Sequence, residues 1–254
     1  MIGHTVFGRG PRRALALHGW LGDRGVFDPV LTALDPEQVS LALMDYRGYG
    51  ASRSMSGPFD IATIARDALA LADHLGWTRF GVIGHSMGGK AALRVAIDAP
   101  QRVASLLGIA PVWAGRVPFD PGTLSLFRNA ARDVRLRAAI IDDTTGNRWP
   151  AAWSRSLAQD STEVSLTEAV AAYFESWACD DFARQCTQIT ANVRVVVGAH
   201  DRGVTQELVT QTWLKELPNA GYSVLAECGH YPMLECPPAL GVVFDSFFAN
   251  MSVA

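Results

Sequence analysis

The sequence predicts an α/β domain in which a mostly parallel central sheet is covered by helices on both faces. Short apolar runs alternate with helical stretches up to about residue 110, stop alternating, and resume near Val193. The runs are almost continuously apolar, which is typical of parallel strands buried on both faces. With 254 residues, 49% of them hydrophobic, the chain is long enough for one large domain, and a second independent domain is not expected.

Each predicted element is bounded by turn chemistry. Strands are expected at six short apolar runs, namely 14–17, 39–44, 80–83, 104–109, 193–197 and 222–226. Helices are expected where apolar residues recur at helical spacing, namely 61–75, 205–217 and 239–248, with a further helical stretch over 90–99. These helices would be the crossover connections between parallel strands.

The segment 112–190 interrupts the alternation and is helical and rich in aromatic residues. We therefore expect a core formed by residues 1–111 and 191–254, with 112–190 inserted into it as a cap. Ligands of open α/β sheets bind outside the carboxyl ends of the strands, and a helical excursion from that edge is expected to wall the pocket.

Three tryptophans of the predicted cap, Trp149, Trp153 and Trp177, are candidate substrate-binding residues. The alternative is that such aromatic residues form the cap's own core. The basic residues of the same segment, Arg128 and Arg132 among them, recur at helical spacing and are interpreted as a solvated helix face.

The composition indicates a small molecule as the partner. The formal net charge is −3 and no basic run is present, so neither nucleic acid nor an anionic membrane is expected to bind. The first residues lack the pattern of a secretion signal, and no run approaches the roughly 18 apolar residues of a membrane span, so a cytoplasmic location is expected. Four cysteines without zinc-like spacing are expected to be free thiols, with no disulfide and no metal: Cys179, Cys186, Cys228 and Cys236.

The pentapeptide Gly84-His85-Ser86-Met87-Gly88 follows a predicted strand and precedes a predicted helix. This is the setting of a nucleophile elbow, a sharp turn that exposes a serine at the top of a sheet and needs small neighbours. We interpret Ser86 as a catalytic nucleophile.

A serine hydroxyl is a weak nucleophile until a neighbouring imidazole takes its proton. Asp201 comes just after the predicted strand 193–197, and His230 lies in the loop after the next one. The order Ser86, Asp201, His230 is the order in which this kind of sheet delivers a catalytic triad, with Asp201 orienting the base His230. His200 is a competing base and Asp120 a reserve acid.

The run His18-Gly19-Trp20 directly follows the predicted strand 14–17. Negative charge that develops on a carbonyl oxygen needs fixed donors, and backbone N–H groups in a turn supply them without reorganising. We expect the N–H groups of Trp20 and Met87 to form the oxyanion hole, and His18 to hold the turn in place.

These segments together resemble the α/β-hydrolase superfamily, in particular its capped, cofactor-independent serine esterase and lactonase branch. The resemblance covers nearly the whole chain and rests on five blocks in order, namely 18–20, 45–52, 84–89, 198–201 and 229–235. It implies an α/β-hydrolase fold with a helical cap inserted after the sixth strand, no cofactor, and a 45–52 turn that shapes the pocket floor. One departure is that only 17 residues precede His18, so the leading hairpin must be short and the sheet is expected to have fewer than eight strands.

The resemblance excludes some reaction classes but does not identify a single reaction. Epoxide hydrolases and haloalkane dehalogenases carry an aspartate where this chain has Ser86. Carbon–carbon hydrolases of ring degradation use serine, but tend to have Asn at the position of His85 and Trp at that of Tyr231. The resulting hypothesis is hydrolysis of a medium-sized, largely apolar ester or lactone through an acyl-enzyme. A carbon–carbon hydrolase and a small-molecule receptor with residual hydrolysis are the alternatives.

Overall fold

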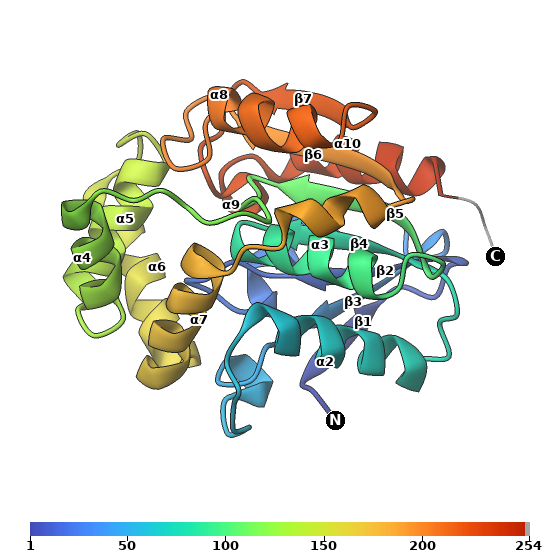
Figure 1. The fold of residues 1–254 in the computed structure, drawn as a ribbon, viewed down its shortest axis with the longest axis horizontal. Coiled ribbons are helices and arrows are strands. Elements are labelled where there is room, and N and C mark those ends of the chain that lie inside the picture. The colour runs from blue at the N-terminus through green and yellow to red at the C-terminus, as the bar shows by residue number, and fades with distance from the viewer. Residues whose placement is uncertain (252–254) are drawn as a thin grey trace.

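The computed structural model describes residues 1–251, which fold around a seven-stranded sheet (Figure 1). The sheet order is β1-β3-β2-β4-β5-β6-β7, and all neighbours are parallel except β1 and β3. The strands are β1 (His4–Phe7), β2 (Arg12–Leu17), β3 (Val39–Met44), β4 (Phe80–His85), β5 (Val103–Ile109), β6 (Asn192–Gly198) and β7 (Gly221–Leu225). The mostly parallel sheet predicted from the sequence is confirmed.

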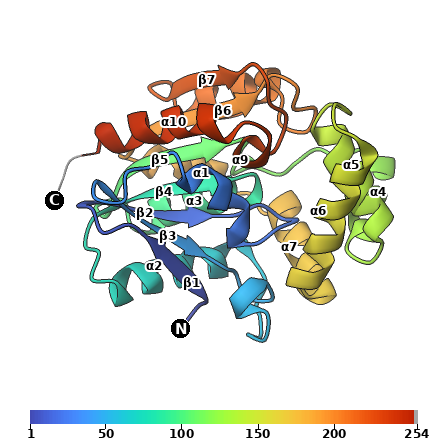
Figure 2. The same cartoon turned by 180° about the vertical axis from the view of Figure 1, so that it is seen from behind.

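Helices cover both faces of the sheet, as Figures 1 and 2 show from opposite sides. Helices α2 and α3 lie on one face, and α1 and α10 lie on the other. Their bounds are α1 (Asp28–Leu31), α2 (Ile61–His74), α3 (Met87–Asp98), α8 (Gln206–Val209), α9 (Pro232–Glu235) and α10 (Pro237–Ala249). The central strands β2 to β5 are consequently almost fully buried.

Strand β1 was not expected from the sequence. It is a four-residue edge strand whose two central residues, Thr5 and Val6, are exposed, so it lacks the continuous apolar pattern of the buried strands. It pairs antiparallel with β3. Because the leading segment supplies this single strand, the sheet has seven strands.

Four helices form the cap between β5 and β6, beyond the carboxyl ends of the parallel strands (Figure 1). They are α4 (Pro121–Ala130), α5 (Val134–Thr144), α6 (Ala151–Val164) and α7 (Thr167–Cys179). The cap therefore follows the fifth strand. The expectation that it follows the sixth was wrong, because the short leading segment leaves one strand fewer before it.

Lys90 of α3 holds the two ends of the cap together. Its fully buried ammonium group donates to the carbonyls of Gly115, Trp177 and Asp180 at 2.9, 2.9 and 2.6 Å. Gly115 lies where the chain leaves the core for the cap, and Asp180 lies where it returns. Burial lowers the pKa of Lys90 to about 8, so the cation persists at neutral pH.

Replacing Lys90 by Met is expected to destabilise the protein by about 2–4 kcal/mol. The buried carbonyl of Trp177 would lose its donor at about 1–3 kcal/mol and the part-buried carbonyls of Gly115 and Asp180 at less, while relief from burying a charge would offset part of that cost. Urea unfolding measures the change, with the exposed Lys215→Met as the matched control. Equal unfolding midpoints for the two variants would contradict this role of Lys90.

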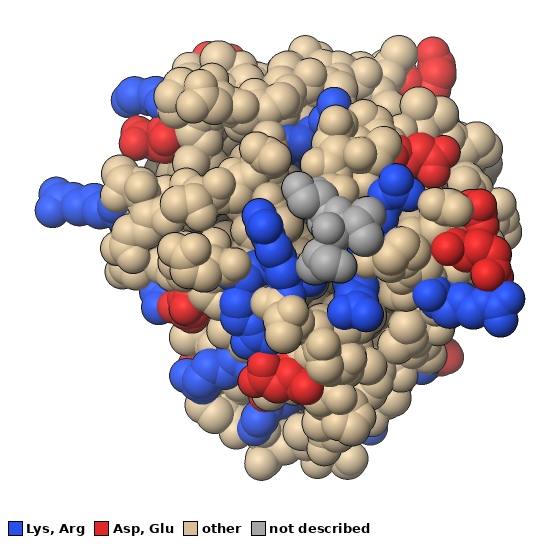
Figure 3. Space-filling model, turned by 90° about the vertical axis from the view of Figure 1, so that its right-hand side faces the viewer, with Lys and Arg blue, Asp and Glu red and all other residues tan. Residues whose placement is uncertain are grey.

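Charge is spread over the face of the molecule distant from the cap. Figure 3 shows basic and acidic side chains interspersed with uncharged ones over the described part of that face. Within residues 1–251, no helix is both long and apolar enough to cross a membrane.

Candidate active site

Ser86 lies on a strained turn between β4 and α3. Its backbone has φ 52° and ψ −118°, a conformation that L-residues rarely adopt. Glycines make room for the turn, since a Cβ on Gly84 would lie 2.2 Å from the carbonyl oxygen of Gly88, and one on Gly88 would lie 2.2 Å from that of Leu17. The strand-turn-helix geometry expected of a nucleophile elbow is present.

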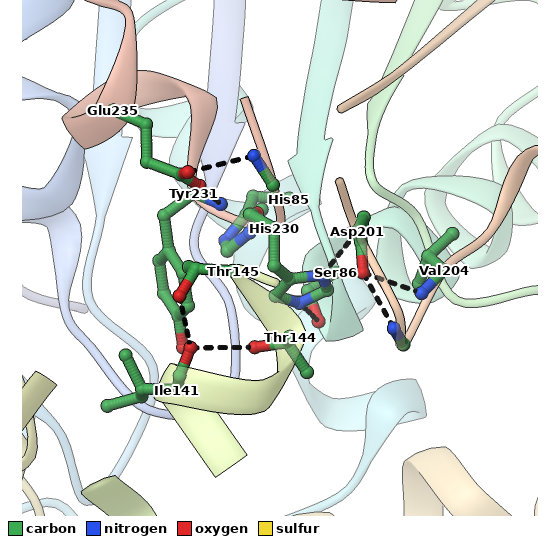
Figure 4. A network of polar contacts seen from close by, with 12 residues as sticks. His85, Ser86, Ile141, Thr144, Thr145, Asp201, Val204, His230, Tyr231 and Glu235 are labelled. Carbon is green, nitrogen blue, oxygen red and sulfur yellow. Dashed lines mark hydrogen bonds and ion pairs between the residues drawn. The ribbon is translucent and has the colours of Figure 1, made fainter. Parts of the chain in front are cut away.

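The structure brings together the three residues predicted to form a triad (Figure 4). His230 Nε2 lies 3.0 Å from Ser86 Oγ, and His230 Nδ1 lies 2.7 Å from Asp201 Oδ2. Asp201 and His230 are buried, whereas Ser86 is partly exposed. The other oxygen of Asp201 accepts the backbone N–H groups of Gly203 and Val204, both at 2.8 Å, which fixes the carboxylate.

The competing candidates lie elsewhere. His200 is exposed to solvent, whereas His230 contacts both Ser86 and Asp201. Asp120 is exposed at the start of α4, where its carboxylate accepts the N–H groups of Gly122 and Thr123 as a helix cap.

The electrostatic surroundings favour the charged form of His230. Burial by itself lowers its pKa, but the negative charge of Asp201, the hydrogen bond to Asp201 and the charge of Glu235 outweigh burial, and the pKa is raised above its ordinary value. His85, whose ring centroid is 5.1 Å from that of His230, has its pKa lowered well below normal, first by burial and then by His230. The pair therefore contains one readily protonated imidazole and one neutral imidazole.

The turn after β2 lies directly against Ser86. A Cβ on Gly19 would be 3.4 Å from Ser86 Cβ and 2.6 Å from His85 Nδ1, so only glycine lets the turn approach this closely. The next residue, Trp20, accepts the Tyr49 hydroxyl at its carbonyl (2.9 Å) and lines the adjacent cavity. Met87 is the first residue of α3, where backbone N–H groups have no partner within the helix.

Residues of the 45–52 turn pack against the turn that carries His18 and Trp20. The ring of His18 stacks on Tyr46 with centroids 3.9 Å apart, and the Tyr46 hydroxyl donates to the His18 carbonyl at 2.7 Å. Burial lowers the pKa of His18 to about 4. His18 is thus a neutral, buried residue that holds the turn.

A cavity of about 390 Å³ opens beside Ser86 and His230, between the sheet and the cap. This volume is in the range of small-molecule sites. Most of its wall is apolar, and much of that wall is aromatic, namely Trp20, Trp113, Phe119, Phe127, Trp177 and Tyr231. The rings of Trp20 and Phe127 stack at 5.7 Å, and Phe127 and Trp177 meet edge to face at 5.8 Å.

The three candidate tryptophans of the cap separate into two groups. Trp177 lines the cavity. Trp149 and Trp153 do not: their rings lie beside each other at 5.8 Å, and the Trp149 indole donates to Glu235 at 3.0 Å. The expectation that they wall the pocket was wrong, because the α5–α6 connection directs Trp149 toward the loop that carries His230. Phe119 and Phe127, which the sequence interpretation did not single out, line the cavity instead.

A disulfide joins Cys228 and Cys236, whose Cα atoms lie 6.2 Å apart. The expectation of four free thiols was therefore wrong; Cys179 and Cys186 are free. The loop after β7 folds back through the short helix α9, which brings the two cysteines within disulfide range. His230 lies inside this covalently closed loop.

The fold and the site together define an α/β-hydrolase: a capped parallel sheet with a serine at the elbow, in contact with a histidine–carboxylate pair. The family model described as alpha/beta hydrolase fold matches residues 15–237, and the chain belongs to this family.

Several similar proteins are named as hydrolases. The chain is 31% identical over 257 residues to pimeloyl-(acyl-carrier protein) methyl ester esterase of Nitrosomonas europaea, covering 94% of this chain and 96% of the relative. It is 28% identical to 3-oxoadipate enol-lactonase 2 of Acinetobacter baylyi, covering 94% and 89%. An esterase from Exiguobacterium antarcticum has the same fold, with a TM-score of 0.87 at 19% identity, covering 98% and 96%. These relatives support hydrolase activity.

Proposed function

We propose that the protein is a serine hydrolase that cleaves the carboxylic ester or lactone of a medium-sized, largely apolar small molecule. The observation that carries this proposal is the chain of contacts from Ser86 through His230 to Asp201 at the wall of an apolar cavity of about 390 Å³. Two of the relatives are named for cleaving a methyl ester and an enol-lactone, which are bonds of this class.

In the proposed reaction, His230 Nε2 takes the proton of Ser86 as its Oγ attacks the substrate carbonyl. Asp201 keeps the imidazole in the tautomer that has its proton on Nδ1 and stabilises the imidazolium. The backbone N–H groups of Trp20 and Met87 stabilise the oxyanion. His230 then gives its proton to the leaving alcohol, and a water activated by His230 releases the acid from Ser86.

The cavity wall favours an uncharged or aromatic group on the substrate. Trp20, Phe127 and Trp177 present ring faces and edges, and contact with such surfaces favours groups that are themselves apolar. The volume of about 390 Å³ accommodates a small molecule of medium size.

The test is steady-state turnover of p-nitrophenyl esters of increasing acyl length and of simple lactones by the wild type and by Ser86→Ala. We expect multiple turnovers by the wild type and a loss of about 10⁴-fold or more in kcat for Ser86→Ala, because the acyl-enzyme cannot form. Full activity of Ser86→Ala would refute the mechanism.

Two alternatives have their own outcomes in the same assay. Turnover of a ring-cleavage dienoate but of no ester would assign carbon–carbon hydrolysis to the site. Tight binding of a small molecule with negligible turnover would assign a receptor function, because an enzyme is expected to cycle at roughly 1–10³ per second on its own substrate.

A further inference from the structure

The connection between the cap helices α5 and α6, residues 145–150, lies against both loops that carry the candidate acid and base. Just before it, Asp143 of α5 pairs with Arg202, the residue after the candidate acid, at 3.3 Å. Within it, a Cβ on Gly146 would lie 2.9 Å from the carbonyl oxygen of His200, the residue before that acid. Farther along, Arg148 donates to the carbonyl of Glu227 at 2.9 Å. The backbones are close, since a Cβ on Gly229 would lie 2.6 Å from Thr145 Cα. The cap thus contacts the His230 loop directly.

Glu235 is the centre of this contact. Its side chain is fully buried, and its two oxygens accept the N–H groups of Gly229 and Tyr231, each at 2.8 Å. These are the residues on either side of His230, so one carboxylate fixes the backbone before and after the imidazole (Figure 4). The same carboxylate accepts the indole N–H of Trp149 from the cap at 3.0 Å.

We propose that Trp149 and Glu235 form a latch by which the cap positions His230 against Ser86 and Asp201. Both are positioning residues: neither touches the reacting atoms, and each acts through the backbone of residues 229–231. This inference rests on the proposed function, because it assigns a role toward His230 as the base.

The latch is expected to act on turnover more than on substrate binding. Trp149 does not line the cavity, so its loss leaves the substrate wall intact. A base displaced by a fraction of an ångström transfers a proton less efficiently, and a misplacement of about 1 Å can cost about 10²-fold in rate.

Glu235 also has an electrostatic signature that a purely structural residue would lack. Asp201 from the β6 loop, Glu235 from α9 and His85 from the end of β4 face His230. The ring of Tyr231, uncharged because burial raises its pKa, lies 5.3 Å from that of His230, and Arg148 of the cap lies 3.7 Å from the carboxylate of Glu235. The two carboxylates raise the pKa of His230, and neutral His85 does not oppose them with a charge. Removing the charge of Glu235 should therefore lower the pKa of the base.

Trp149→Phe removes the indole N–H and keeps an aromatic ring, and Trp153→Phe is its matched control on the neighbouring tryptophan. We expect Trp149→Phe to lower kcat for a p-nitrophenyl ester by about 10-fold with KM within about twofold of the wild type. Trp153→Phe should leave both constants near wild-type values. Equal kcat values for the two variants, with both folded by thermal unfolding, would overturn the latch.

Glu235→Gln keeps an acceptor for one backbone N–H and removes the charge. We expect a lower kcat and an acidic limb of the kcat/KM profile that lies at lower pH than in the wild type. If the two residues act as one unit, adding Trp149→Phe to Glu235→Gln should cost less than it costs in the wild type. An unmoved acidic limb or fully additive effects would overturn the proposal.

Ser86→Ala, assayed in parallel, separates the two proposals. If Ser86→Ala retains activity, the serine mechanism fails and the latch fails with it. If Ser86→Ala is inactive while Trp149→Phe and Glu235→Gln behave as the wild type, only the latch fails.

Discussion

Asp201→Asn is expected to lower kcat by about 10⁴-fold while leaving the fold intact. An asparagine amide at this position would favour the imidazole tautomer with its proton on Nε2, facing Ser86 Oγ, so His230 could no longer accept the serine proton. Asparagine is nearly the same size as aspartate and its oxygen can still accept the N–H groups of Gly203 and Val204, so the loop should keep its shape.

The pH dependence provides a second readout of the same variant. In the proposed mechanism, activity requires neutral His230 and is lost as the pH falls through its pKa, which is raised above the ordinary 6.5 in the wild type. Because the charge of Asp201 raises that pKa, the residual activity of Asp201→Asn should have its acidic limb at lower pH. The matched control is Asp120→Asn, at an exposed helix cap where asparagine serves equally well. A near wild-type rate for Asp201→Asn would show that a residue other than Asp201 is the acid that orients His230.

Gly88→Ala is expected to destabilise the protein by about 3 kcal/mol or more and to abolish ester turnover. The added Cβ would lie 2.2 Å from the carbonyl oxygen of Leu17 and 2.7 Å from that of His18, both backbone atoms that cannot rotate away. Relief requires α3 to move away from β2, which costs packing energy and shifts the elbow away from the turn of Trp20.

Thermal and urea unfolding of Gly88→Ala, with ester turnover measured on the folded fraction, tests this expectation. Gly221→Ala at the start of β7 is the control, since its Cβ would meet its nearest neighbour at an ordinary 3.6 Å. A folded, active Gly88→Ala protein with a wild-type unfolding midpoint would contradict the tight fit of the elbow.

The meeting of the three proposed triad residues was the most predictable part of the site from the sequence. Ser86, Asp201 and His230 each lie beyond the carboxyl end of a parallel strand, and the order of such loops along the chain is set by the parallel sheet. Short, continuously apolar strands are easy to recognise, whereas the exposed edge strand β1 gives no such pattern.

The cap was predictable as a segment but not in detail. Which face of a cap helix meets the cavity depends on how the helices pack, and their local sequence does not fix that rotation. This is why Phe127 lines the cavity while Trp153 does not. The disulfide was missed for a related reason, because a spacing of eight residues says nothing about whether the loop between Cys228 and Cys236 turns back on itself.

The hydrogen bonds of Lys90 bring the two ends of the cap close together. The carbonyl oxygens of Gly115 and Asp180 both accept from Lys90 Nζ, so the two ends of this long insertion leave and re-enter the core at neighbouring points. Insertions whose ends lie close together are tolerated well by a host domain. Recombination between relatives at these two points could replace the whole cap and its aromatic wall in a single step, and so change the substrate range while leaving Ser86, Asp201 and the sheet beneath them in place.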